Sequence, residues 1–313
     1  MRHLLLTLSL LLSSLVSGAS VNTGHAEASL ITNLQNGQQE SFYLGVRLNM
    51  QEGWHTYWEN PGDSGGTFEA TWETDEGVIV ENVEWPTPVT IPYPPLMTFG
   101  YEGDVIFPFK VFRATGTELS TVSLNFSFLI CADICIPEEA NLFIDLASAN
   151  PSVILGDAID RLPVEFIAIN SEVGANEIHL QFNSDQDVAK AYFFPREVDL
   201  FAYEPTQDLI RLDDNNFQLT LPTLNSNIEN FSGVLSLDGQ GYQVQEELPA
   251  STGSMSLFMA IVFALLGGLI LNLMPCVFPV ISLKVLSFVA MGGNDHAKIR
   301  NHALTFVAGV LFT

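Results

Sequence analysis

Three cysteines are the residues of this chain best suited to chemistry, and two of them lie four positions apart. Cys131 and Cys135 occur in FLICADICIPEE, and Cys276 occurs in LMPCVFP. Two nearby thiols can form a structural disulfide, exchange electrons with another disulfide, or bind a metal together with Asp133. The spacing leaves the first two uses open. A metal site is not expected, because no histidine lies nearby in the sequence and zinc usually takes four ligands.

A direct bond between Cys131 and Cys135 requires the chain to turn between them. In one extended strand, four residues would hold the two Cα atoms about 13 Å apart, whereas a disulfide needs them within about 7 Å. The flanking segments favour a hairpin whose loop is residues 132–134. The apolar residues of the incoming strand occupy even positions from 124 to 130. Cys131 is therefore expected on the opposite, more accessible face.

Cys276 lies in an apolar segment between two prolines. Pro275 and Pro279 each lack a backbone N–H and interrupt a helix. Broken backbone at membrane depth is tolerated only where it is packed in protein or lines a cavity. A thiol at such a break is well placed for disulfide exchange. The alternative is a small apolar cysteine in a packed core.

Aromatic residues and a histidine gather in the run Trp54–Trp58, which reads WHTYW. A histidine beside aromatic rings can tune a redox site. Such a run is more often core structure before a turn, and here NPGD follows after Glu59. The structural interpretation is favoured, and the other stays open.

The elements that position these residues are predicted to be β-strands. Apolar and polar residues alternate with period two in several runs, which is the pattern of half-buried strands. These runs are residues 124–130, 142–146, 178–182 and 217–221. Glycine and proline separate them, and long amphipathic helices are hard to find. We expect two successive β-sandwiches, a redox domain at residues 28–147 and a second domain at 151–247.

The two ends of the chain predict export and membrane insertion. Residues 1–19 have the charged start, apolar run and small-residue exit of a signal peptide, with cleavage as late as residue 26. Met255–Met274 is long enough to cross a bilayer, and residues 255–313 are expected to be a truncated transmembrane domain. Lys298 and Arg300 predict a cytoplasmic loop. Residues from about 20 to 250 then lie on the outer side.

The charge is strongly acidic and unevenly distributed. The chain has 36 Asp and Glu against 11 Lys and Arg, a formal charge of −25. Between Glu27 and Glu247 there are 35 acidic and seven basic residues. This balance argues against a nucleic-acid-binding protein, which needs a basic face. A solvated acidic surface is the simpler interpretation, and a cationic partner is the alternative.

Three stretches resemble bacterial thiol:disulfide interchange proteins of the DsbD/ScsB type. They are Gly53–Gly65, Phe128–Pro137 and Asn272–Leu286. The resemblance covers the exported part and the start of the membrane part, and the last stretch is the most specific. The CxxxC spacing and the second β-domain fit the copper-tolerance branch of the family.

The resemblance implies an electron relay across the inner membrane of a bacterium. A multi-pass membrane domain of the cytochrome c biogenesis type takes reducing equivalents from cytoplasmic thioredoxin, with no cofactor. Cys276 and a membrane cysteine absent from this sequence pass them outward to an exported immunoglobulin-like domain. There Cys131 and Cys135 reduce periplasmic thioredoxin-fold proteins, which makes the protein a protein-disulfide reductase. A C-terminal thioredoxin-like domain, also absent here, normally follows.

The resemblance also implies an order of attack and a shield. By analogy, Cys135 forms the mixed disulfide with partners and Cys131 resolves it. Phe99 and Tyr101, in an aromatic loop at residues 97–103, are expected to cap the sulfurs. Ordinary core positions are the alternative for both rings. Two other functions remain open for the chain: a membrane-anchored β-sandwich module for binding or assembly with a structural disulfide, and a copper-handling protein.

Overall fold

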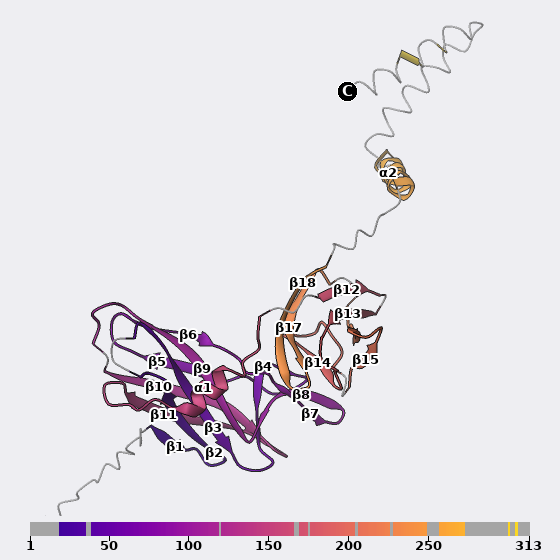
Figure 1. The fold of residues 1–313 in the computed structure, drawn as a ribbon. Coiled ribbons are helices and arrows are strands. Elements are labelled where there is room, and N and C mark those ends of the chain that lie inside the picture. The colour runs from indigo at the N-terminus through magenta and orange to yellow at the C-terminus, as the bar shows by residue number, and fades with distance from the viewer. Residues whose placement is uncertain are drawn as a thin grey trace, which may run out of the picture. The chain divides into compact units, whose positions relative to one another are not determined.

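The computed structural model divides into two compact units, Met1–Ala250 and Ser251–Thr313. It describes residues 19–35, 39–118, 120–165, 169–174, 176–203, 206–225, 228–248, 257–272, 300, 304 and 305. The first unit is built mainly from β-strands (Figure 1). The prediction that this region is mainly β is therefore confirmed. The predicted signal peptide falls outside the described residues except for Ala19.

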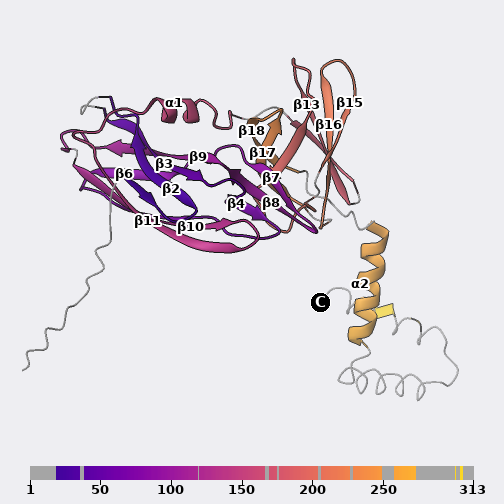
Figure 2. The ribbon, with the colours of Figure 1, turned by 90° about the horizontal axis from the view of Figure 1, so that it is seen from below.

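The first β-domain consists of two antiparallel sheets. We call one the disulfide sheet. Its strand order is β11 (Cys135–Asp145), β10 (Thr121–Cys131), β4 (His55–Gly62), β8 (Leu96–Glu102) and β7 (Val89–Tyr93), and β5 (Glu69–Glu73) also pairs with β10. The other is the facing sheet, in the order β1 (Ser20–Asn22), β2 (Ala26–Thr32), β3 (Ser41–Met50), β9 (Asp104–Arg113) and β6 (Val78–Val83). Figure 2 shows these sheets as two layers.

The core of this domain lies between the two sheets. The even positions of β10, from Leu124 to Ile130, are all buried, as the alternating pattern predicted. The ring of Phe68 lies 4.8 Å from the rings of both Phe107 and Phe126, measured between centroids. Each fully buried aromatic or aliphatic side chain stabilises the fold by roughly 1.5–3 kcal/mol. This core keeps the long strands of the disulfide sheet in register.

A short helix, α1 (Val153–Ile159), follows the first β-domain and packs on the outside of the facing sheet (Figure 2). Leu155 is fully buried there. A Cβ atom at Gly45 on β3 would lie 2.7 Å from the Leu155 Cδ1 atom. Glycine at position 45 therefore makes room for the leucine that seats the helix.

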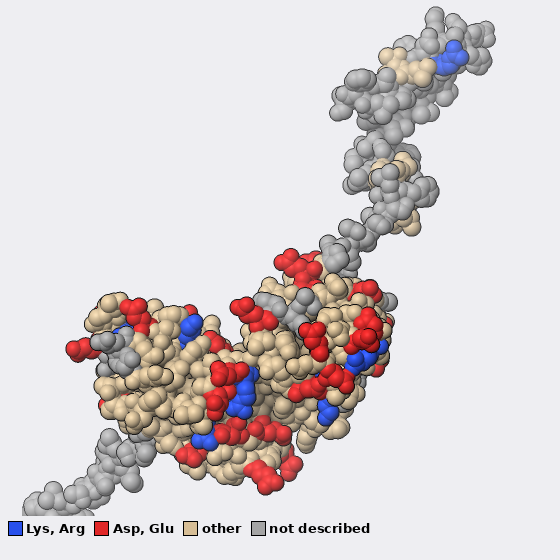
Figure 3. All heavy atoms as spheres, in the orientation of Figure 1, with Lys and Arg blue, Asp and Glu red and all other residues tan. Residues whose placement is uncertain are grey.

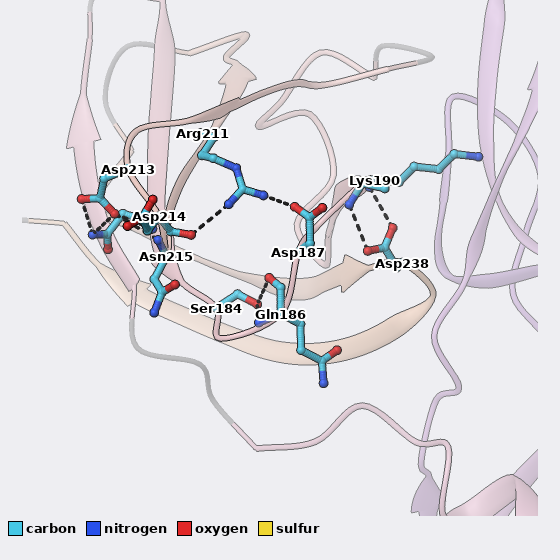
Figure 4. A network of polar contacts seen from close by, with 11 residues as sticks. Ser184, Gln186, Asp187, Lys190, Arg211, Asp213, Asp214, Asn215 and Asp238 are labelled. Carbon is cyan, nitrogen blue, oxygen red and sulfur yellow. Dashed lines mark hydrogen bonds and ion pairs between the residues drawn. The ribbon is translucent and has the colours of Figure 1, made fainter.

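The second β-domain has two smaller antiparallel sheets and a core of its own. One sheet has the order β12 (Ile169–Val173), β13 (Glu177–Asn183), β16 (Asn216–Pro222) and β15 (Asp208–Arg211); the other has the order β14 (Ala191–Pro195), β17 (Asn230–Leu237) and β18 (Gln240–Glu247). Its polar loops are joined by the network in Figure 4, where Arg211 forms an ion pair with Asp187 and Asp238 accepts the backbone N–H of Lys190.

The two β-domains share a buried contact within the first unit. Phe194 of the second domain belongs to the core of the first, and its ring centroid lies 5.2 Å from that of Phe99 and 6.1 Å from that of Trp58. The buried Asn60 side chain donates to the Pro195 carbonyl over 2.8 Å. The Arg196 guanidinium contacts Glu59 over 2.7 Å. Strand β4 thus meets the second domain at its far end.

The second unit contains one described helix, α2 (Leu257–Asn272), which lies within the predicted membrane segment. Among the described residues, no helix has the length and apolar character that a membrane crossing requires. Cys276 and its flanking prolines, Pro275 and Pro279, lie outside the described residues.

Candidate redox site

The cysteine pair closes the longest hairpin of the molecule's described part. Cys131 is the last residue of β10, and Cys135 is the first residue of β11. They are the final pair of an eleven-pair antiparallel register that begins at Thr121 and Asp145. Their Cα atoms lie 4.1 Å apart and their sulfurs are bonded. The expected direct bond across a three-residue turn is confirmed.

The two sulfur-bearing residues differ in accessibility, and not in the way the sequence pattern predicted. Cys131 is only 1% exposed, whereas Cys135 is exposed. The expectation that Cys131 would lie on an accessible face was wrong. The reason is that β4 pairs with β10 on its other edge, with His55 opposite Cys131. Cys131 is thus enclosed between two strands, and Cys135 lies on the edge strand, where a partner can reach it.

Tyr57 is the aromatic residue whose hydroxyl reaches the disulfide. Its oxygen lies 3.5 Å from the Cys135 Sγ atom. Because a disulfide sulfur carries no proton, the Tyr57 O–H is the donor. Burial raises the pKa of Tyr57 above its ordinary value of 10.0, so the hydroxyl stays protonated at neutral pH. The donor is therefore in place whenever Cys135 carries negative charge.

A glycine holds the Tyr57 ring in place. Gly65 has φ +107°, a backbone conformation that side chains disfavour. A Cβ atom at this position would lie 2.1 Å from the Tyr57 Cε1 atom. The chain after β4 can therefore lie directly on the tyrosine ring only because residue 65 is glycine.

His55 adds a half-buried imidazole to the same end of the sheet. Its ring centroid lies 5.3 Å from that of Tyr57, in an edge-on arrangement. Burial lowers the pKa of His55, and the nearby Glu102 carboxylate opposes that effect. The side chain is therefore mostly neutral at pH 7. Strand pairing brings His55 and Tyr57 next to the cysteines, although about 75 residues separate them in the sequence. The sequence spacing therefore gives no sign that these residues lie together.

A buried carboxylate ties the edge strand to the facing sheet. Glu138, three residues after Cys135, is 8% exposed. Its Oε1 atom lies 2.6 Å from the His25 Nδ1 atom, and its Oε2 atom accepts a hydrogen bond from the Thr23 hydroxyl. The His25 ring lies on the Trp54 ring, with 3.9 Å between centroids. This network fixes the start of β11, which carries Cys135, at its outer edge.

The two residues expected to cap the sulfurs have other described contacts. Phe99 is fully buried against rings of the second domain, and the Tyr101 hydroxyl donates to the Pro86 carbonyl over 2.8 Å. Burial raises the pKa of Tyr101 well above 10.0. The expected loop at residues 97–103 is mostly strand β8, because Gly100 lets β8 approach the Thr56 carbonyl closely. Shielding by Phe99 and Tyr101 stays a prediction.

Across the described part of the chain, no group of three or more His, Cys, Asp or Glu side chains is arranged to hold a metal ion. The bonded sulfurs of Cys131 and Cys135 are engaged with each other.

The comparisons with known proteins agree with this geometry. Residues 27–147 match the family described as thiol:disulfide interchange protein DsbD, N-terminal. The chain is similar in fold to the N-terminal periplasmic domain of ScsB from Proteus mirabilis, with a TM-score of 0.58, 19% sequence identity, and 74% of this chain and 98% of that chain covered. The periplasmic chaperone SfaE matches with a TM-score of 0.19 and 13% identity over 70% of this chain and 97% of that chain. That score is too low to indicate a shared fold.

No curated protein sequence matches the chain significantly. The family match includes the whole Cys131–Cys135 hairpin together with His55 and Tyr57. Residues 27–147 of this chain therefore form a domain of the DsbD N-terminal family of thiol:disulfide interchange proteins, and the chain shares the fold of the ScsB periplasmic domain.

Proposed function

We propose that this chain is the outer part of a protein-disulfide reductase that passes electrons across a bacterial inner membrane to periplasmic proteins. The observation that carries the proposal is the asymmetric disulfide: Cys135 is exposed on an edge strand, Cys131 is buried behind it, and the Tyr57 hydroxyl contacts the Cys135 sulfur. Thiol–disulfide exchange needs one accessible sulfur to attack and one protected sulfur to resolve.

The reducing half of the cycle begins with the dithiol form. The Cys135 thiolate attacks one sulfur of a client disulfide, and the client's S–S bond breaks. The client's second sulfur leaves as a thiolate and takes a proton from solvent. Cys131 then loses its proton and attacks the Cys135 Sγ atom, which releases the client's first sulfur. The pair loses two electrons and two protons, and the client gains both.

Tyr57 assists the first step in this mechanism. A hydrogen bond to a charged sulfur favours the thiolate over the thiol. The 3.5 Å contact to the disulfide sulfur places the hydroxyl where it can make that bond after reduction. Burial keeps Tyr57 protonated, so the residue donates without giving up its proton.

Regeneration of the dithiol is assigned to the membrane part. In this proposal Cys276, between the helix-breaking prolines, forms the membrane relay with a second membrane cysteine. Cytoplasmic thioredoxin supplies the electrons, and a C-terminal thioredoxin-like domain mediates between the membrane and the exported β-domains. Periplasmic thioredoxin-fold proteins are the acceptors. Residues from about 20 to 250 lie in the periplasm as two immunoglobulin-like β-sandwiches, and copper tolerance is one physiological setting.

Trapping of mixed disulfides tests the proposal and its order of attack. Cys131→Ser leaves the attacking cysteine without its resolving partner, so covalent complexes with client proteins should accumulate. Cys135→Ser should trap none. Non-reducing gels resolve the two cases, with the wild-type chain as control. Complexes with Cys135→Ser alone would reverse the order and leave the exchange chemistry intact.

The reduction potential separates exchange from a structural role. Structural disulfides usually have potentials below about −300 mV, and exchange-active ones lie higher. Equilibration of the chain with mixtures of reduced and oxidised glutathione should place the Cys131–Cys135 couple above that value. A lower value would favour a binding or assembly module with a structural bond.

Shielding of the reduced pair by Phe99 and Tyr101 belongs to the same proposal. Both rings are buried, so alanine variants would lose stability through cavities. Phe99→Leu and Tyr101→Leu remove the rings and keep part of the buried volume. If the rings limit access, the reduced variants should oxidise faster with a small disulfide under conditions where unfolding curves show both to be fully folded. Unchanged rates in both would end the shielding assignment.

A further inference from the structure

An exposed aliphatic side chain stands at the tip of the cysteine hairpin. Ile134 is 64% exposed, although it lies in the turn between the two bonded cysteines. It is followed directly by the exposed Cys135 and preceded by the exposed Asp133. A partner whose sulfur reaches Cys135 therefore comes close to Ile134. Removal of its apolar surface from water on docking is favourable.

The sheet that carries this tip has an unusual charge. The strands of the disulfide sheet contain seven acidic residues and no Lys or Arg, whereas those of the facing sheet contain three of each. All three Lys and Arg residues between positions 27 and 147 lie on the facing sheet: Arg47, Lys110 and Arg113. If the acidic residues served only to solvate the surface evenly, the two sheets would carry similar net charges.

Three exposed carboxylates lie around the accessible sulfur. Asp133 is in the turn, Glu102 is opposite His55 in the strand register, and Glu139 points outward on β11 like Cys135. Three strand spacings separate Glu102 from the accessible Cys135, about 14 Å between Cα atoms, and Glu139 lies about 13 Å from it along β11. These distances slightly exceed the screening length of about 10 Å at 0.1 M salt and lie within the roughly 20 Å expected at 0.02 M salt. The carboxylates therefore act together on an approaching partner.

These carboxylates lack the cationic partners and turn roles that acids have elsewhere in the molecule. In the second domain, Asp187 is paired with Arg211, and Asp213 accepts the side chain and backbone of Asn216 (Figure 4). Within the described residues, Asp133, Glu102 and Glu139 form no ion pair with Lys or Arg. Figure 3 shows that acidic side chains outnumber basic ones on the face in view.

We propose that the hairpin tip docks a protein whose reactive disulfide lies in an apolar patch with a basic rim. The patch receives Ile134, and lysine or arginine side chains on the rim face Asp133, Glu102 and Glu139. This inference rests on the proposed exchange function and names the class of partner for it. Like charges on a wrong partner disfavour its approach, so the carboxylates give selectivity and faster association together.

Charged peptide disulfides test the docking chemistry directly. The probes are disulfide-linked dimers of acetyl-Lys-Cys-Lys-amide, acetyl-Ser-Cys-Ser-amide and acetyl-Glu-Cys-Glu-amide. The 313-residue chain is used in an uncharged detergent, with Cys276→Ser so that only the exported pair reacts. Each rate is divided by the rate of the same peptide with 2-mercaptoethanol, which removes differences in intrinsic reactivity. At about 20 mM salt we expect the lysine peptide to react about tenfold faster than the glutamate peptide.

Matched variants locate the effect. Asp133→Asn, Glu102→Gln and Glu139→Gln together should bring the lysine-to-glutamate ratio close to one. The control changes the same number of exposed charges in the second domain, Glu172→Gln, Asp208→Asn and Asp214→Asn, and should leave the ratio unchanged. About 0.5 M salt should reduce the ratio in the parent chain, because exposed charges are then screened.

A separate rate measurement tests the contribution of Ile134. Insertion of leucine after the cysteine of the lysine peptide should raise the rate about threefold with the parent chain, because partial burial of an aliphatic side chain against Ile134 is favourable. With Ile134→Ser the gain should disappear, while the preference for lysine over glutamate persists. The triple-substitution variant and Ile134→Ser change only exposed positions, so their unfolding midpoints should stay within experimental error of the parent.

Three outcomes would overturn the docking proposal: equal rates with lysine and glutamate peptides, a ratio that survives the triple substitution, or a leucine gain that Ile134→Ser retains. Failure of every peptide to react has a different meaning. It would contradict the proposed exchange function itself, since even the neutral serine peptide should be reduced by an active dithiol.

Discussion

Two hairpins of the first unit are closed in different ways. The β10–β11 hairpin turns through Ala132, Asp133 and Ile134 and is closed by the disulfide. The β17–β18 hairpin pairs Leu237 with Gln240 and turns through Asp238 and Gly239, whose φ angles are 49° and 96°. Asp-Gly is a preferred pair for such a two-residue turn.

The difference suggests that the turn of the second hairpin stabilises the fold, whereas the disulfide of the first hairpin serves the exchange reaction. The turn of the second hairpin is favoured by its residues and by Asp238, which accepts the N–H groups of Ala189 and Lys190. The first hairpin lacks glycine in its turn, but it has an eleven-pair register, which we expect to hold the strands together without the bond. A disulfide that the strands do not require for pairing is free to open and close during exchange.

Loss of the accessible sulfur should have the largest effect. Cys135→Ser is expected to lower the rate of peptide disulfide reduction by more than about 10³-fold, because no other described thiol is exposed at the hairpin. The unfolding midpoint should match that of the reduced wild-type chain. Retention of a substantial rate would mean that Cys131 becomes accessible and would weaken the distinction between the two cysteines.

Gly239→Val should damage the other hairpin without touching the chemistry. A β-branched residue at φ +96° is strained by about 2–3 kcal/mol. Urea unfolding measures this loss, and the rate of peptide reduction by the remaining folded protein should be unchanged. Gly239→Asn is the matched control, since asparagine tolerates positive φ and should lose much less stability. Equal losses for Val and Asn would show that the turn conformation is not decisive.

Reduction of the Cys131–Cys135 bond should cost about 2 kcal/mol or less, which is what chain entropy gives for a loop of five residues. Comparison of urea unfolding in oxidised and reduced protein measures the difference. Amide protons of β10 between Val122 and Ile130 should remain protected from exchange in the reduced form. Loss of that protection would show that the bond does hold the hairpin together.

Tyr57→Phe should produce a smaller effect, confined to the reaction. A hydrogen bond to a charged group contributes about 1.5–3 kcal/mol when fully formed, and part of it is replaced by water in the variant. The rate at pH 7 should fall several-fold, and the pH profile of exchange should shift upward, because the thiolate of Cys135 is less favoured. An unchanged pH profile would remove Tyr57 from the mechanism and leave it a packing residue.

His55 should give the smallest effect, visible only in the pH dependence of stability. Burial lowers the pKa of His55 below its ordinary value of 6.5, so the unfolded chain binds more protons just below that pH. The free energy of unfolding should therefore rise with pH up to about pH 6.5. His55→Gln should reduce this slope, as urea unfolding at several pH values would show. An identical slope would indicate that the imidazole is not constrained by burial.

The sequence predicted the strands and the bond better than it predicted their surroundings. Period-two patterns identified β10, β13 and β16, and the short spacing between strands identified the turn at residues 132–134. The burial of Cys131 and the position of Tyr57 depend on pairing between β10, β4 and β11. Neither follows from local pattern, because strand order in a sheet is fixed by contacts between segments far apart in the chain.

The same limit applies to Phe99. Its neighbours in the sequence indicate an aromatic segment flanked by glycines, which is compatible with a loop. Its burial comes from Phe194 and Tyr203, about a hundred residues later. The charge difference between the two sheets was equally hidden, because it appears only after strands from different parts of the chain are sorted into their sheets.

The shared contact between the β-domains has a practical consequence for anyone dissecting this protein. The family match ends at residue 147, yet the core of that segment includes Phe194 and Val234 from beyond it. A chain cut after Ala147 would leave Trp58 and Phe99 facing water and Asn60 without its carbonyl acceptor. Such a fragment should expose apolar surface and self-associate. Expression of a chain that stops at residue 147 would then report poor solubility rather than the properties of the redox site.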